Sequence, residues 1–127
     1  GDSLKVDAQY KSRSPITYFA GAREVAIDIC AGINDGHQGS VPISHSINAF
    51  NMIAEAKGDR PVTETEISQL SRPGKLDEAQ AGDEGFDGTF GRKYFLRRRS
   101  GNARLTIFDG GHEGIASATI AWFENHP

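Results

Sequence analysis

Two short glycine-rich turns in this 127-residue chain carry an acid and a base that could do hydrolytic chemistry together. The first turn, Gly-Ile-Asn-Asp35, follows the apolar run 25–31, and the second, Asp-Gly-Gly-His112, follows the apolar run 103–108. A carboxylate that hydrogen-bonds an imidazole fixes its tautomer and stabilises its protonated form, as a histidine general base requires. We therefore take Asp35 and His112 as candidate catalytic residues, with a nucleophile still to be found.

Two strands and two helices must position these turns. Short runs rich in β-branched residues predict strands near 25–31 and 103–109, and helical spacing of apolar residues predicts helices near 44–57 and 114–125. A further strand near 92–98 would form a hairpin with the strand that follows it. The sequence therefore predicts an α/β fold.

The relative direction of the two principal strands decides whether the acid and the base meet. If these strands lie parallel with the first helix as the crossover, both turns leave the sheet at the same edge. Neighbouring strands lie about 4.8 Å apart, so side chains just beyond their ends can reach each other. We expect Asp35 and His112 to face each other there.

Composition favours a single globular domain over residues 1–127, with the acidic, glycine-containing segment 58–91 as a surface excursion. A net charge of −3 and 24% charged residues give no general attraction to nucleic acid or to an anionic membrane, and no apolar run could span a bilayer. The single Cys30 excludes an internal disulfide framework. The cytoplasm and secretion after removal of a signal both stay open as locations.

The order of these turns resembles the C-terminal part of a serine α/β-hydrolase of the prolyl-oligopeptidase and acyl-esterase type. In that family a strand ends in Gly-x-x-Asp, here at Asp35, a Val-Pro step follows, here at 41–42, and a later strand ends in Gly-Gly-His, here at His112. The resemblance covers about residues 14–57 and 100–125. It implies a partial α/β-hydrolase sheet, Asp35 as triad acid and His112 as triad base, and a small ester or peptide as substrate of the full enzyme, with no cofactor.

The same resemblance implies a nucleophile that this chain does not supply. The family places its serine in a Gly-x-Ser-x-Gly elbow upstream of the acid. None of the ten serines here has a glycine both two residues before it and two residues after it. The chain therefore resembles the C-terminal portion of a longer or truncated hydrolase that would be inactive alone. A sheet cut in this way exposes an edge, so we expect a homodimer or a higher oligomer.

Four polar residues near the two turns are candidates for the rim of the site, namely Asn34, His37, His45 and Asp109. Asp35 with the two loop histidines could in principle bind zinc, but their spacing matches no established ligand pattern, and we expect no metal. Each of these residues, and the catalytic pair itself, also has a purely structural interpretation as a hydrogen-bonded turn residue.

Two other functions are compatible with the sequence. Gly-Asp-Ser3-Leu, Asn34 and the Asp109–His112 turn are similar to three blocks of the GDSL or SGNH esterases. This resemblance implies Ser3 as the nucleophile, Asn34 as an oxyanion donor, and Asp109 and His112 as the acid and the base. Alternatively, the chain is a non-catalytic α/β module that oligomerises. The basic run 92–99 invites a nucleic-acid interpretation, but acidic neighbours predict local ion pairs, and we expect no nucleic-acid partner.

Overall fold

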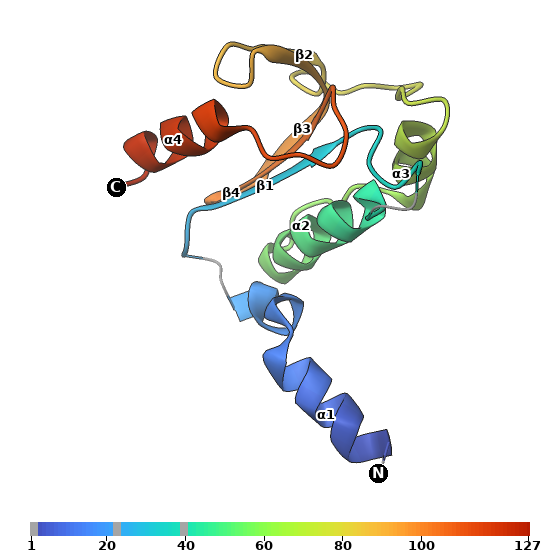
Figure 1. Ribbon diagram of the computed structural model, residues 1–127, viewed down its shortest axis with the longest axis vertical. Coiled ribbons are helices and arrows are strands. Elements are labelled where there is room, and N and C mark those ends of the chain that lie inside the picture. The colour runs from blue at the N-terminus through green and yellow to red at the C-terminus, as the bar shows by residue number, and fades with distance from the viewer. Residues whose placement is uncertain (1–2, 22–23, 39–40) are drawn as a thin grey trace.

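A four-stranded mixed β-sheet with helices on both of its faces forms the body of the protein (Figure 1). The computed structural model describes residues 3–21, 24–38 and 41–127. In chain order the elements are α1 (Ser3–Arg13), the 3-10 helix η1 (Pro15–Gly21), β1 (Ile27–Gly32), α2 (Ile43–Lys57), α3 (Glu64–Ser71), β2 (Gly85–Asp87), β3 (Arg92–Ser100), β4 (Ala103–Phe108) and α4 (Ala116–Asn125). The predicted α/β class is therefore confirmed, and the structure shows that the sheet is mixed.

The sheet has the strand order β1-β4-β3-β2, so β1 and β2 are its outer strands. β1 runs parallel to β4, with Gly32 opposite Phe108 at the carboxyl ends, whereas the β4–β3 and β3–β2 pairs are antiparallel. The predicted hairpin between β3 and β4 turns at Gly101, whose φ of 54° is accessible to glycine at little cost. Because β1 and β4 are parallel neighbours, the loops that follow them begin at the same edge.

The main core lies between α2 and one face of the sheet, and α4 lies on the opposite face (Figure 1). Apolar residues of α2 recur at helical spacing and pack in one cluster with alternate residues of β1 and β4 and with Leu96 of β3. Burial of each such side chain stabilises the fold by roughly 1.5–3 kcal/mol. The fully buried members include Ile47, Phe50 and Ile53 of α2, Leu96 of β3, and Leu105 and Ile107 of β4.

Predicted element bounds agree with the structure to within two residues. The strand predicted at 25–31 is β1 at 27–32, that at 103–109 is β4 at 103–108, that at 92–98 is β3 at 92–100, and the helices predicted at 44–57 and 114–125 are α2 at 43–57 and α4 at 116–125. β1 starts late because Val25 is exposed and pairing begins only where Ile27 donates its backbone N–H to the Asn102 carbonyl. Pro42 is the N-cap residue of α2, and no side chain accepts a capping hydrogen bond from the first turn of this helix.

Segment 58–91 was expected as a surface excursion, and the structure corrects this. It contains α3 and β2, and it contributes buried apolar side chains to the main core, namely Val62, Ile67, Leu70 and Leu76. Helix α3 begins with a capping box, in which Thr63 and Glu66 each accept a hydrogen bond from the other's backbone N–H. This segment is therefore part of the packed domain.

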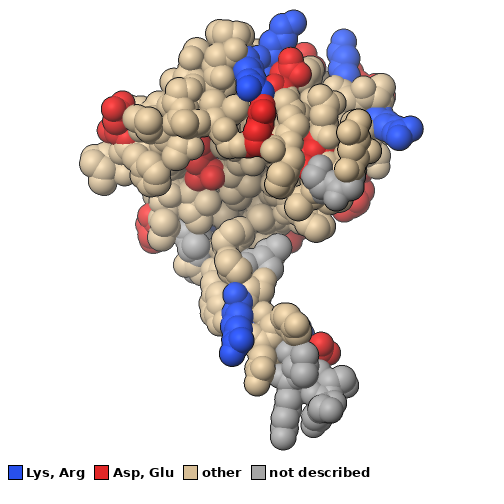
Figure 2. Space-filling model, in the orientation of Figure 1, with Lys and Arg blue, Asp and Glu red and all other residues tan. Residues whose placement is uncertain are grey.

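The N-terminal helix α1 points away from the sheet (Figure 1). On the face drawn in Figure 2, Lys and Arg side chains are interspersed with Asp and Glu. The predicted local pairs in the basic run are present: Arg97 pairs with Asp87 at 2.8 Å, and Arg98 pairs with Asp83 at 2.6 Å. No helix in the described part of the chain has the length and apolar character needed to cross a bilayer.

Candidate acid and base pair at the sheet edge

The loops that follow β1 and β4 bring Asp35 and His112 together. Gly32 and Phe108 lie opposite each other at the ends of the parallel strands. Asp35 lies three residues beyond Gly32, and His112 lies four residues beyond Phe108. His112 Nδ1 lies 3.0 Å from Asp35 Oδ2. The side chain of Asp35 is 11% exposed and that of His112 is 68% exposed, so a nearly buried carboxylate contacts an imidazole that is open to solvent.

This contact determines which ring nitrogen is available for chemistry. An ionised carboxylate only accepts hydrogen bonds, so Nδ1 of His112 donates its proton to Asp35. In the neutral ring Nε2 then carries the lone pair, and it can take a proton from an approaching hydroxyl group. The arrangement is that of a general base held in one tautomer by a carboxylate.

Backbone hydrogen bonds fix the two loops against each other. Ile33 donates its N–H to the carbonyl of Phe108 at 2.8 Å, and Asn34 donates to the carbonyl of Gly110 at 2.9 Å. Asp35 closes its own turn by donating to the carbonyl of Gly32 at 2.9 Å. Parallel pairing therefore continues beyond the last residues of β1 and β4, up to the residue before Asp35.

The four predicted rim residues occupy different positions around this pair. Asn34 is exposed and contacts the histidine loop through its backbone, and Asp109 is exposed at the end of β4, where its N–H donates to the carbonyl of Lys93 at 2.9 Å. His37 is exposed in the loop after β1, and His45 is exposed in the first turn of α2. Gly39 and Ser40 of that loop lie outside the described residues.

The residues of the GDSL-like interpretation are dispersed. Ser3 is the first residue of α1, which points away from the sheet (Figure 1). The imidazole of His112 contacts Asp35, whereas that interpretation assigns Asp109 as the acid. Gly1 and Asp2 of the Gly-Asp-Ser-Leu block lie outside the described residues. Among the described residues, no group of three or more His, Cys, Asp and Glu side chains is arranged to hold a metal ion.

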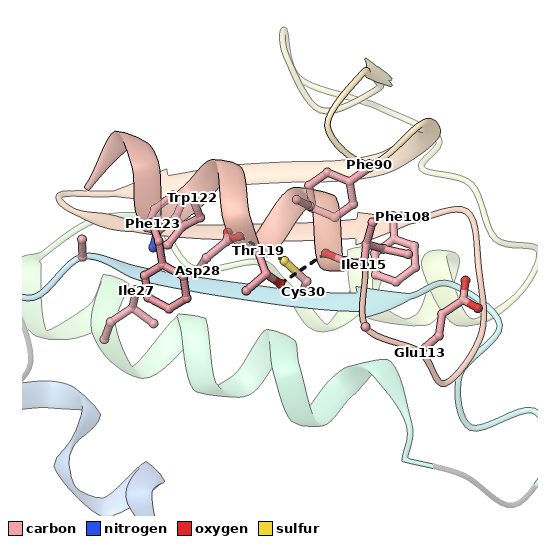
Figure 3. A pocket seen from close by; sticks show the side chains of 13 residues that line it. Ile27, Asp28, Cys30, Phe90, Phe108, Glu113, Ile115, Thr119, Trp122 and Phe123 are labelled. Carbon is pink, nitrogen blue, oxygen red and sulfur yellow. Dashed lines mark hydrogen bonds between the residues drawn. The ribbon is translucent and has the colours of Figure 1, made fainter. Parts of the chain in front are cut away.

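A groove of about 440 Å³ between β1 and α4 was not predicted from the sequence (Figure 3). It is lined mainly by apolar and aromatic side chains, among them Ile27, Phe90, Phe108, Ile115, Trp122 and Phe123. The groove begins at Glu113, the residue after His112, and extends along the face of β1 that carries Asp28 and Cys30. Asp28 and Cys30 alternate with the apolar residues Ile27, Ile29 and Ala31. Because alternate residues of a strand lie on the same face of the sheet, this pattern could have predicted that one face of β1 is polar.

Asp28 and Cys30 of β1 are polar residues in the lining of the groove. Arg104 on β4 donates from Nε and Nη2 to the two carboxylate oxygens of Asp28 on β1, at 2.9 and 3.0 Å. The Sγ of Cys30 lies 3.4 Å from Asp28 Oδ2. Burial of the thiol and the neighbouring carboxylate raise the pKa of Cys30 to about 12, so this thiol is protonated and a poor nucleophile at neutral pH.

Comparison of the chain with protein families, with curated proteins and with solved structures returns no match.

Proposed function

We propose that this chain supplies the acid and the base of a Ser-His-Asp triad that hydrolyses ester or amide bonds, with the serine contributed by another segment. One observation carries the proposal: the contact of His112 Nδ1 with Asp35 Oδ2 at the carboxyl ends of two parallel strands. Loops at this edge of an open α/β sheet are where such folds commonly place their ligands. The exposed imidazole leaves room for a hydroxyl group at Nε2.

In the proposed reaction, each residue moves or stabilises a defined charge. His112 Nε2 takes the proton from the serine hydroxyl as the oxygen attacks the carbonyl carbon, and it returns that proton to the leaving alkoxide or amine. In the second half of the reaction His112 Nε2 takes a proton from water as the water oxygen attacks the acyl carbon, and it gives that proton to the serine oxygen as the acyl–serine bond breaks. Asp35 keeps Nδ1–H directed at its carboxylate and stabilises the imidazolium that forms in each step.

The serine is assigned to another segment for two reasons. None of the ten serines of this chain lies in a Gly-x-Ser-x-Gly elbow, the strand-to-helix turn that exposes a hydrolase nucleophile. In addition, β1 is an outer strand, so the sheet can accept a further strand beside the acid. The resemblance to prolyl oligopeptidases and acyl esterases supports the same assignment and keeps ester and peptide substrates equally open.

Labelling with a fluorophosphonate tests the proposal, because this probe reacts only with a serine that a working base activates. Two proteins are compared. The first is the chain alone, and the second, longer protein also includes the residues encoded immediately upstream of the chain in the genome. We expect the longer protein to be labelled at a serine outside residues 1–127. His112→Gln and Asp35→Asn should slow this labelling by a factor of about 10³ to 10⁴, whereas Arg99→Gln, which changes an exposed residue of β3 outside the site, should not.

The alternatives predict different labelling. Labelling of Ser3 in the chain alone would favour the GDSL-like interpretation and contradict the proposal. Labelling of neither protein, or labelling of the longer protein that is insensitive to His112→Gln, would also contradict it. In those cases the contact between Asp35 and His112 would be structural.

A further inference from the structure

Arg92, the first residue of β3, contacts the histidine loop on both sides of His112. Its Nη1 donates to the backbone carbonyl of Asp109 at 3.2 Å and forms an ion pair with Glu113 Oε1. Asp109 precedes His112 by three residues, and Glu113 follows it directly. One guanidinium nitrogen therefore joins the two ends of the segment that carries the candidate base.

The loop packs directly on this guanidinium group. Arg92 Cζ lies 5.9 Å from the centre of the Phe108 ring, at the end of β4. A Cβ atom at Gly110 would lie 2.6 Å from Phe108 Cε2, 2.7 Å from Arg92 Nη1 and 2.8 Å from Glu113 Oε1, so the loop backbone packs closely against all three side chains because this residue is glycine. Any side chain at this position would have to displace the Phe108 ring and the ion pair.

The contacts of Arg92 complement those from β1. On one side, the backbone of Ile33 and Asn34 donates to the carbonyls of Phe108 and Gly110. On the other side, Arg92 holds the segment from β3. The His112 side chain itself is 68% exposed and therefore is not fixed by burial, so its direction depends on the backbone that these two sets of contacts hold.

We propose that Arg92 is a positioning residue that keeps Nδ1 of His112 directed at Asp35. This inference rests on the proposed function for its catalytic consequence, although the positioning itself can be measured without activity. Arginine suits the role because one terminal nitrogen bears two N–H groups, one for each acceptor, and its charge is permanent. A lysine at this position offers a point charge on a flexible stem and should hold the loop less well.

Nitrogen-15 NMR of histidine-labelled chain tests the positioning. The two ring nitrogens have distinct shifts, so the spectrum reports which one carries the proton, and His112→Gln assigns the signal. We expect the native His112 to be in the Nδ1–H tautomer. Arg92→Gln should shift the population toward Nε2–H and accelerate exchange of the Nδ1 proton with water at least tenfold, with Arg92→Lys in between. Arg99→Gln, which removes an exposed arginine of the same strand, should match the native protein.

A second measurement separates this inference from the proposed function. In the longer protein, Arg92→Gln should lower the limiting rate of fluorophosphonate inactivation at least tenfold and leave the half-saturating probe concentration unchanged. If no protein is labelled but the NMR response appears, the proposed function fails and the positioning holds. If Arg92→Gln folds and matches Arg99→Gln in tautomer, proton exchange and inactivation rate, the inference is wrong.

Discussion

Gly32 and Gly110 are in direct backbone contact where β1 and β4 end. A Cβ atom at Gly32 would lie 2.5 Å from the carbonyl carbon and from the oxygen of Gly110, and 2.3 Å from the oxygen of Gly111. Such distances are far below van der Waals contact, and the opposing atoms are backbone atoms with little freedom to move. The loops that carry Asp35 and His112 therefore meet at a spacing that only glycine permits.

Gly32→Ala should consequently separate the two loops. We expect it to lower the free energy of unfolding by about 1–3 kcal/mol, as overpacking does, and to lengthen the contact between His112 and Asp35. Urea unfolding measures the first effect, and the nitrogen-15 signals of His112 measure the second. Gly114→Ala is the matched control, because a Cβ there would meet nothing within 4 Å. A Gly32→Ala protein with native stability and tautomer would contradict this account.

Asp87 should make the stability of the protein depend on pH in acid. Burial alone would raise the pKa of its carboxyl, but hydrogen bonds from Thr89 and Arg97 outweigh burial and lower the pKa to about 2 from an ordinary value of 3.8. A carboxyl with a lowered folded-state pKa contributes stability above the unfolded-state pKa, and that stability is lost as the pH falls through the folded-state pKa. The contribution is about 2 kcal/mol above pH 4 and disappears near pH 2.

Urea unfolding of Asp87→Asn between pH 2 and pH 6 measures this contribution. The difference in free energy of unfolding between the native and variant proteins should be largest near pH 6 and should shrink as the pH approaches 2. Glu78→Gln removes the same charge from an exposed site of the same segment and shows whether net charge alone has an effect. A difference for Asp87→Asn that does not change with pH would refute the prediction.

Cys30 should react slowly with thiol reagents although part of the residue is exposed to solvent, because its thiol is largely surrounded by protein. A pKa raised from 9.0 to about 12 reduces the thiolate fraction near neutral pH by about a thousandfold. The remaining thiolate is intrinsically more nucleophilic, which recovers part of this loss, so the net reduction is roughly 30- to 60-fold. Reaction with an aromatic disulfide at pH 7.5 should therefore be slower by that factor in the folded protein than in urea.

Asp28→Asn tests the cause of the slow reaction at Cys30. It removes the neighbouring negative charge that raises the thiol pKa, so the folded variant should react faster than the folded native protein. Equal rates in the two folded proteins would assign the protection to burial alone. A native rate equal to that in urea would show that the thiol is not protected.

Removal of Arg98 should destabilise the fold more than removal of any exposed arginine. Arg98 donates to both carboxylate oxygens of Asp83, which is 1% exposed, and to Glu66 on α3. Arg98→Met would leave Asp83 as a buried charge without its cation, at a cost of about 3–5 kcal/mol. Thermal or urea unfolding measures this loss, with Arg99→Gln as control, and a loss below about 1 kcal/mol would contradict the prediction.

The candidate acid and base could be selected from the sequence because their signals are local. Each of the two residues follows a short β-branched run and a glycine turn, and this pattern lies within a short stretch of sequence. The parallel direction of the two strands then brings Asp35 and His112 together at the carboxyl ends of β1 and β4. Helix α2 was predictable for the same reason, since Ile47, Phe50 and Ile53 recur at helical spacing.

The contacts that hold these elements were not predictable because they join distant positions. Arg92 meets Glu113 across 21 residues, and Arg98 meets Glu66 across 32 residues. Segment 58–91 looked like surface because its few apolar residues show little periodicity, although the capping box at Thr63 marked the start of α3. Its burial is decided by tertiary packing.

The packing of α4 on the sheet gives the protein a built-in optical probe. Trp122, the only tryptophan of the chain, is 8% exposed, stacks on His126 at 3.8 Å between ring centres and lies 4.8 Å from the guanidinium carbon of Arg104. Its emission therefore reports one event, the attachment of the last helix to β4. A red shift that precedes the loss of circular dichroism would show α4 leaving the sheet while the β1–β4 edge with Asp35 and His112 remains folded.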